Sequence, residues 1–249
     1  MTAREQAPLE ADRHFRWRGG NVSRIEGLSD GVFGLAVALL AFAQRAPADY
    51  ADLVETFREL PAFVLSCTFL LWCWYLHYKF FRRFGLQDML TIVLNGALLL
   101  FLLFFVYPLR FLANYLVTGP LFYGGMGRGP VGDSVANLGQ GPELMLFYAG
   151  SFTLLFLCFA LLNLNGYRKR EALGLDPAEC HLALADVRSH FISLGIGVLS
   201  LAFALAGQRA LSGLVFFLMG PLHGAHGWWS GSRFEKLRRA GAPGVAAGG

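Results

Sequence analysis

The chain has 249 residues, of which 55% are hydrophobic and only 15% are charged, whereas about 25% of residues are charged in a typical soluble domain. The formal net charge of +4 comes from short clusters between long apolar runs, which excludes a solvated globular surface and the basic patch of a nucleic-acid-binding protein. The four cysteines, Cys67, Cys73, Cys158 and Cys180, form no C-x-x-C pair and are interpreted as small apolar thiols.

Six apolar segments have about the length that crosses a bilayer core, roughly 20 residues for 30 Å. They lie near residues 27–44, 60–78, 89–117, 145–165, 190–207 and 210–229. The predicted fold class is therefore all-α, a multi-pass membrane protein with six transmembrane helices. We divide it into an N-terminal segment (1–26), a six-helix transmembrane domain (27–229) and a C-terminal tail (230–249).

Three connections refine this prediction. The third span is long and contains Tyr107-Pro108, so we expect a kink or a helix that continues beyond the membrane. The stretch 118–142 is rich in Gly and Pro and predicts an irregular external loop. Gly207-Gln208-Arg209 leaves room only for a tight hairpin before the last span.

The Lys and Arg residues alternate between the two sides of this predicted arrangement. Sixteen of them fall on the side of the termini and five on the other. By the positive-inside rule, both termini are expected in the cytoplasm and the protein in the cell membrane.

The entry of the first span carries an acidic residue, Asp30, within an apolar run. An ionisable residue in a span is costly and marks a candidate functional site. The second span runs back and ends in Trp74-x-x-His77, which brings His77 to about the depth of Asp30. We expect a hydrogen bond between Asp30 and His77. The alternative, weighed evenly, is that His77 belongs to an interfacial belt.

The remainder of the first span combines small and bulky residues. Gly27, Gly31 and Gly34 allow close helix contact, and Leu35, Leu39 and Phe42 recur at helical spacing. Taken alone, the small residues indicate packing, and the bulky ones a core or lipid-facing stripe.

Two motifs on neighbouring helices add a resemblance to a known family. The run Arg24-x-x-x-Leu28-Ser29-Asp30 resembles the R-x-x-x-F-S-D signature of the transmembrane protein 175 family of potassium channels, and Trp74-x-x-His77 resembles the end of that family's second helix. The resemblance implies a bacterial member with one six-helix repeat per chain. It also implies a homotetramer in the lipid bilayer, with the first helix of each chain lining a central pore.

The resemblance also implies roles for single residues. It puts the main apolar constriction, a hydrophobic gate, at Leu35, with Ala38, Leu39 and Phe42 further along the pore. It puts a further group of residues in a polar network that holds the first helix: Arg24, Ser29, Asp30, Trp74 and His77.

Two positions depart from the family pattern. Leu28 replaces the signature phenylalanine, which is a mild apolar exchange. Ala38 stands where threonine or serine is common, which leaves the degree of preference for potassium over sodium open.

The sequence therefore predicts a potassium-selective, leak-type cation channel, with potassium as the permeant ion, no cofactor, no metal site and no enzymatic activity. The alternative is a proton-coupled secondary transporter in which Asp30 carries protons and His77 relays them. A membrane enzyme that uses histidines is disfavoured, because the histidines are scattered. His223 and His226 are interpreted as an interfacial helix end rather than as metal ligands, and Asn95 and Asn114 as interhelical hydrogen-bond donors.

Overall fold

The computed structural model describes residues 12, 14–42, 48–118 and 142–241, and every regular element in these ranges is a helix. The all-α prediction is confirmed. The helices are α1 (Arg24–Phe42), α2 (Tyr50–Phe84), α3 (Met89–Thr118), α6 (Pro142–Arg168), α7 (Pro177–Leu205), α8 (Arg209–Leu214), the 3-10 helix η3 (Val215–Leu218) and α9 (Met219–Gly241).

Five helices of the described part are long and apolar enough to cross a membrane, namely α1, α2, α7 and the segments 89–110 of α3 and 145–168 of α6. The first five expected spans each fall on one of them. Helix α7 is much longer than the expected span of 190–207, because it begins in a polar capping box in which Asp176 and Glu179 bind each other's backbone amides, with Pro177 in the first turn.

The expected sixth span is not one continuous apolar helix. Its residues form α8, η3 and the start of α9. Pro221 has no amide hydrogen to donate to the preceding turn, and the tighter 3-10 turn lies just before it at Val215–Leu218. The count of six spans remains a prediction.

Element boundaries differ from the predicted spans mainly at polar ends. Helix α2 begins at Tyr50, where Asp49 caps it, and ends at Phe84, just before Gly85, whose φ of 60° is left-handed. Helix α3 continues past Pro108 to Thr118. The hairpin at Gly207 is confirmed, with a φ of 74°, whereas the expected loop 118–142 lies almost entirely outside the described residues. Helix α9 runs to Gly241, well into the expected C-terminal tail.

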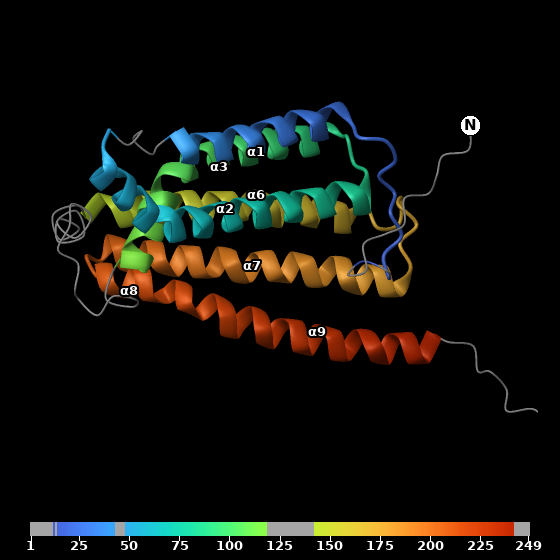
Figure 1. The fold of residues 1–249 in the computed structure, drawn as a ribbon. Coiled ribbons are helices and arrows are strands. Elements are labelled where there is room, and N and C mark those ends of the chain that lie inside the picture. The colour runs from blue at the N-terminus through green and yellow to red at the C-terminus, as the bar shows by residue number, and fades with distance from the viewer. Residues whose placement is uncertain (1–11, 13, 43–47, 119–141, 242–249) are drawn as a thin grey trace, which may run out of the picture.

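The helices pack side by side, with α1 along one edge on α2 and α3 and α9 along the opposite edge on α7 (Figure 1). Between them lies a core rich in phenylalanine, in which Phe105, Phe152 and Phe156 are fully buried. The outer helix α9 leans away from α7 toward its C-terminal end (Figure 1).

The segment before α1 is folded against the end of this bundle. Phe15 is 1% exposed, and Arg18 binds Glu179 at the start of α7 with a 2.6 Å ion pair. The amides of Arg18 and Gly19 both donate to the carbonyl of Arg82 at the end of α2. The N-terminal segment therefore connects the beginning of α1 to the ends of α2 and α7.

Candidate functional site

Helix α1 begins with a capping box. Ser23 Oγ accepts a hydrogen bond from the Glu26 amide, and Glu26 Oε1 accepts from both the amide and the hydroxyl of Ser23. The other carboxylate oxygen of Glu26 is paired with Arg82 of α2, which also donates 2.7 Å to the carbonyl of Gly20. The sequence interpretation missed Glu26, although the Ser-x-x-Glu spacing could have indicated it.

One turn further along, a buried chain of hydrogen bonds joins three helices. Ser29 Oγ of α1 accepts from the Asn95 side chain of α3 at 3.0 Å, and Asn95 Oδ1 lies 2.8 Å from His77 Nε2 of α2. All three side chains are almost completely buried. The prediction that Asn95 donates between helices is confirmed, whereas the side chain of Asn114 lies outside the described residues.

Asp30 is held separately from this chain. Its carboxylate accepts a 2.8 Å hydrogen bond from the indole Nε1 of Trp74. The expected hydrogen bond between Asp30 and His77 is therefore wrong. Neighbouring residues on a helix point about 100° apart, so Ser29 faces the buried His77–Asn95 pair while Asp30 points toward the more exposed indole.

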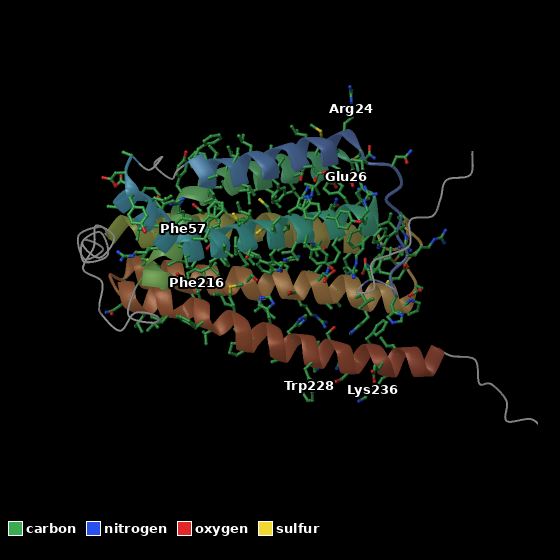
Figure 2. The ribbon with its side chains drawn as sticks, viewed as in Figure 1. Arg24, Glu26, Phe57, Phe216, Trp228 and Lys236 are labelled. Atoms are coloured by element: carbon green, nitrogen blue, oxygen red, sulfur yellow. The ribbon has the colours of Figure 1, made fainter. Side chains whose placement is uncertain are left out.

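The structure separates Arg24 from the other residues of the expected polar network. Its side chain is exposed and points away from the bundle (Figure 2). In the same turn, Glu26 rather than Arg24 is paired with a side chain of α2, that of Arg82. Neighbouring helices are hydrogen-bonded through Ser29, Asp30, Trp74 and His77. Among the described residues, the side chain of Arg24 makes no such bond.

The far end of α1 is anchored as well. Arg110 of α3 donates to the carbonyl of Leu40 at 2.8 Å and pairs with Glu59 of α2 at 2.6 Å. A cation at the last carbonyls of a helix also complements the helix dipole. No side-chain pattern could have revealed this contact, because the acceptor is the main chain.

Between these two anchors, one side of α1 is uncovered. Leu28, Leu35 and Phe42 are 65%, 51% and 84% exposed, and a Cβ added at Gly27, Gly31 or Gly34 would meet nothing within 4 Å. These six residues, which we name the open face of α1, form a continuous stripe. Ala38 and Leu39, which lie between Leu35 and Phe42 in the sequence, are half-buried.

The comparisons with known proteins agree on a family. A family model described as the endosomal/lysosomal potassium channel TMEM175 matches residues 24–106, from α1 into α3. A potassium channel of Marivirga tractuosa is 32% identical over 220 residues, which cover 84% of this chain and 87% of the relative. This chain belongs to the TMEM175 family.

A solved structure supports the assignment to the TMEM175 family, and a second one shows the same fold. The crystal structure of a threonine-to-alanine variant of the potassium channel MtTMEM175, bound to a nanobody fusion protein, has a TM-score of 0.74 and 31% identity. The match covers 88% of this chain and 97% of the solved chain. A TMEM175 homologue from Chamaesiphon minutus has the same fold, with a TM-score of 0.52, 24% identity and 83% and 96% coverage.

Family membership decides the class of protein. The TMEM175 family chain is a multi-pass membrane protein from a family of potassium channels, and it is not an enzyme. The transporter alternative has Asp30 carry protons and His77 relay them; the structure bonds these two residues to different partners.

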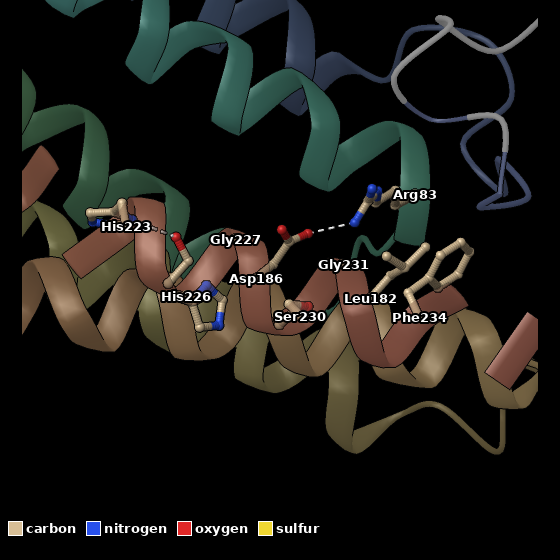
Figure 3. Close-up of a pocket in the computed structure, with 11 residues that line it drawn as sticks. Arg83, Leu182, Asp186, His223, His226, Gly227, Ser230, Gly231 and Phe234 are labelled. Carbon is tan, nitrogen blue, oxygen red and sulfur yellow. Dashed lines mark hydrogen bonds and ion pairs between the residues drawn. The ribbon is translucent and has the colours of Figure 1, made fainter. Parts of the chain in front are cut away.

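A second polar region lies between α7 and α9, where a crevice of about 350 Å³ opens (Figure 3). Asp186 lines it and pairs with Lys79 and Arg83 of α2, while His223 is bound to the hydroxyls of Ser189 and Ser193. In the part of the chain that the structure describes, no group of three or more His, Cys, Asp or Glu side chains is placed to hold a metal ion. The crevice is a network of charged and hydroxyl groups that joins α2, α7 and α9.

Proposed function

We propose that this protein is a potassium-selective, leak-type channel in which four copies surround one pore lined by the open face of α1. The observation that carries the proposal is this uncovered stripe on a helix that is anchored at both ends. A pore-lining helix requires one side free for the permeation path and a fixed position in the wall. Among the helices that the structure describes, α1 packs only on α2 and α3, which leaves that side uncovered by them.

The residues along the open face fit a pore with a polar entrance and an apolar interior. Arg24 and Asp30 are both exposed at the first end of α1, where charged groups favour contact with water over contact with lipid. Leu35 and Phe42 follow deeper along the helix. We infer a vestibule at Arg24 and Asp30 that leads to a ring of Leu35 side chains.

At that ring, permeation depends on hydration. Apolar constrictions gate by excluding water, so an ion passes only when the ring is wide and the ion sheds part of its hydration shell. Potassium holds its water less tightly than sodium and is favoured. Ala38 offers no hydroxyl to a partly dehydrated ion, so we propose that the apolar ring alone sets the preference.

The polar anchors have a positioning role in this mechanism. The Ser29–Asn95–His77 chain and the Asp30–Trp74 bond hold α1 on α2 and α3, so that Leu35 is directed away from the core. We further infer that α8, η3 and α9 together make the sixth crossing and that both termini are in the cytoplasm, in agreement with the distribution of Lys and Arg.

The test is potassium and sodium flux from liposomes that contain the purified protein, with Leu35→Asn as the variant. We expect passive flux that favours potassium and that changes in rate or selectivity in this variant. Leu154→Asn is the matched control, because Leu154 is also exposed but lies on α6, which makes no contact with α1.

Other outcomes contradict defined parts of the proposal. Unchanged flux in Leu35→Asn, or equal changes in both variants, would show that the open face does not line the pore. Absence of passive flux together with proton-coupled uptake would identify a transporter. Native mass spectrometry of the purified protein in detergent tests the expected count of four chains.

A further inference from the structure

The exposed side chains of the last segment, α8–η3–α9, change from apolar to basic along its length. Exposed apolar side chains come first, with Leu214, Phe217 and Leu222 each 44–55% exposed. Two tryptophans follow, of which Trp228 is 77% exposed. Exposed basic residues, Arg233 and Lys236, come last. This order of apolar, aromatic and basic groups is that of a bilayer, from its hydrocarbon core through the interface to the headgroups.

The tryptophan next to Trp228 is flanked by two guanidinium groups. The Cζ atom of Arg233 lies 4.4 Å from the ring centroid of Trp229, and that of Arg188 on α7 lies 5.3 Å from it. Cation–π contacts of this kind fix the position of an arginine without neutralising its charge. Two positive groups are thus held beside an interfacial aromatic ring.

The charge of this segment is strongly asymmetric. Residues 219–241 contain four basic residues, Arg233, Lys236, Arg238 and Arg239, and one acidic residue, Glu235. Trp228 and Lys236 both point away from the bundle (Figure 2). The α9 outer face is the name we give to a surface made of five residues of this segment and one of α7. These residues are Leu222, Trp228, Trp229, Arg233, Lys236 and, from α7, Arg188.

We propose that the α9 outer face is a binding surface for anionic phospholipid headgroups in the leaflet at the basic end of the bundle. Charge complementarity decides the occupant, because several positive groups next to a tryptophan belt attract anionic lipid. The apolar part of the same helix contacts the acyl chains of the bound lipid. The surface lies on the edge of the bundle opposite α1 (Figure 1), so it is separate from the proposed pore.

Tryptophan fluorescence in lipid nanodiscs tests the proposal on the full-length protein. One set of nanodiscs carries brominated phosphatidylglycerol in phosphatidylcholine, and the other carries the same fraction of brominated phosphatidylcholine in otherwise identical discs. Bromine quenches indoles that it contacts. The fluorescence quenching of the Trp228→Phe variant is subtracted from that of the unmodified protein. The remainder is the quenching of Trp228 alone, separated from that of the other tryptophans.

We expect brominated phosphatidylglycerol to quench Trp228 severalfold more than brominated phosphatidylcholine, and high salt to reduce the excess. The double variant Arg233→Gln/Lys236→Gln should lower the apparent affinity for phosphatidylglycerol about thirtyfold. The control Arg16→Gln/Arg168→Gln also removes two exposed charges from the same end and should leave the excess unchanged.

Two results would overturn the proposal. Equal quenching by both lipids would show a tryptophan belt without headgroup preference. Absence of quenching by either lipid would show that protein covers this face, as in contact with a second copy. Neither result depends on whether ions pass through the protein.

Discussion

Arg110 of α3 donates a 2.8 Å hydrogen bond to the main-chain carbonyl of Leu40, in the last turn of α1. The same guanidinium pairs with Glu59 of α2. At the opposite end of α1, Glu26 is paired with Arg82. The helix that carries the open face is thus fixed at each end by an arginine from a neighbouring helix.

Replacing Arg110 by methionine, which keeps the length of the side chain and removes its charge, should lower the free energy of unfolding by about 1.5–3 kcal/mol. Both the Leu40 carbonyl and Glu59 would lose their donor. The measurement is denaturant unfolding in detergent micelles. Arg110→Lys keeps the charge but cannot serve two acceptors with a planar group, so it should recover only part of the loss. Full stability in Arg110→Met would exclude an anchoring role.

A double-mutant cycle measures the chain of hydrogen bonds at the other end. Ser29→Ala and Asn95→Ala each break the 3.0 Å bond between these two residues, and Asn95→Ala also leaves His77 without its partner. We expect a favourable coupling energy of about 0.6–1.7 kcal/mol, the range for hydrogen bonds between membrane helices. Strictly additive effects on unfolding would show that the bond contributes nothing to stability.

Two glycines of α7 provide a matched pair for close packing. A Cβ on Gly197 would lie 2.6 Å from the Thr153 hydroxyl and 3.2 Å from its Cα atom, whereas a Cβ on Gly195 would meet nothing within 4 Å. Gly197→Ala should therefore lower stability by about 1–3 kcal/mol through overpacking against α6. Gly195→Ala should be neutral or stabilising by up to about 1 kcal/mol, because alanine favours the helix. Equal melting temperatures for the two variants would contradict this packing.

Asp88, just before α3, predicts a pH dependence of stability. Burial acts to raise the pKa of Asp88, but hydrogen bonds from Lys169, Thr91 and Asn165 outweigh it and lower the pKa from 3.8 to about 2. A lowered carboxyl pKa stabilises the folded state above the unfolded pKa, and this contribution is lost as the pH falls. Thermal unfolding between pH 4 and pH 2 should therefore depend less on pH in Asp88→Asn. An unchanged pH profile would show that Asp88 is not responsible.

Apolar patterning predicted the membrane helices better than their ends or contacts. The runs of about 20 apolar residues located the first five long helices, because hydrocarbon thickness fixes their length. Polar extensions such as the turn at Asp176 and Glu179 carry no hydropathy signal, so the start of α7 was misplaced. The effect of Pro221 on the last span was present in the sequence, although the apolar run around it dominated the interpretation.

The sequence predicted which residues form the polar site better than it predicted their hydrogen-bond partners. Ser29, Asp30, Trp74 and His77 do contact neighbouring helices, yet the partner of Asp30 depends on the rotation of α1 relative to α2. A sequence fixes the depth of two residues on antiparallel helices but not this rotation. The Arg110–Leu40 bond was out of reach for another reason, since any carbonyl at the end of α1 is an equivalent acceptor in the sequence.

The attachment of Arg18 to Glu179 limits how far the first helix can travel. Only five residues of chain lie between Arg18 and Arg24, where α1 begins, and the six Cα–Cα steps from Arg18 to Arg24 span about 20 Å at full extension. The N-terminal segment is therefore a short connection that limits the distance between the beginning of α1 and the start of α7. Shortening it by a few residues must pull α1 toward α7 or detach Arg18, whereas lengthening it with glycine and serine would remove this restraint and leave α1 held only by its contacts with α2 and α3.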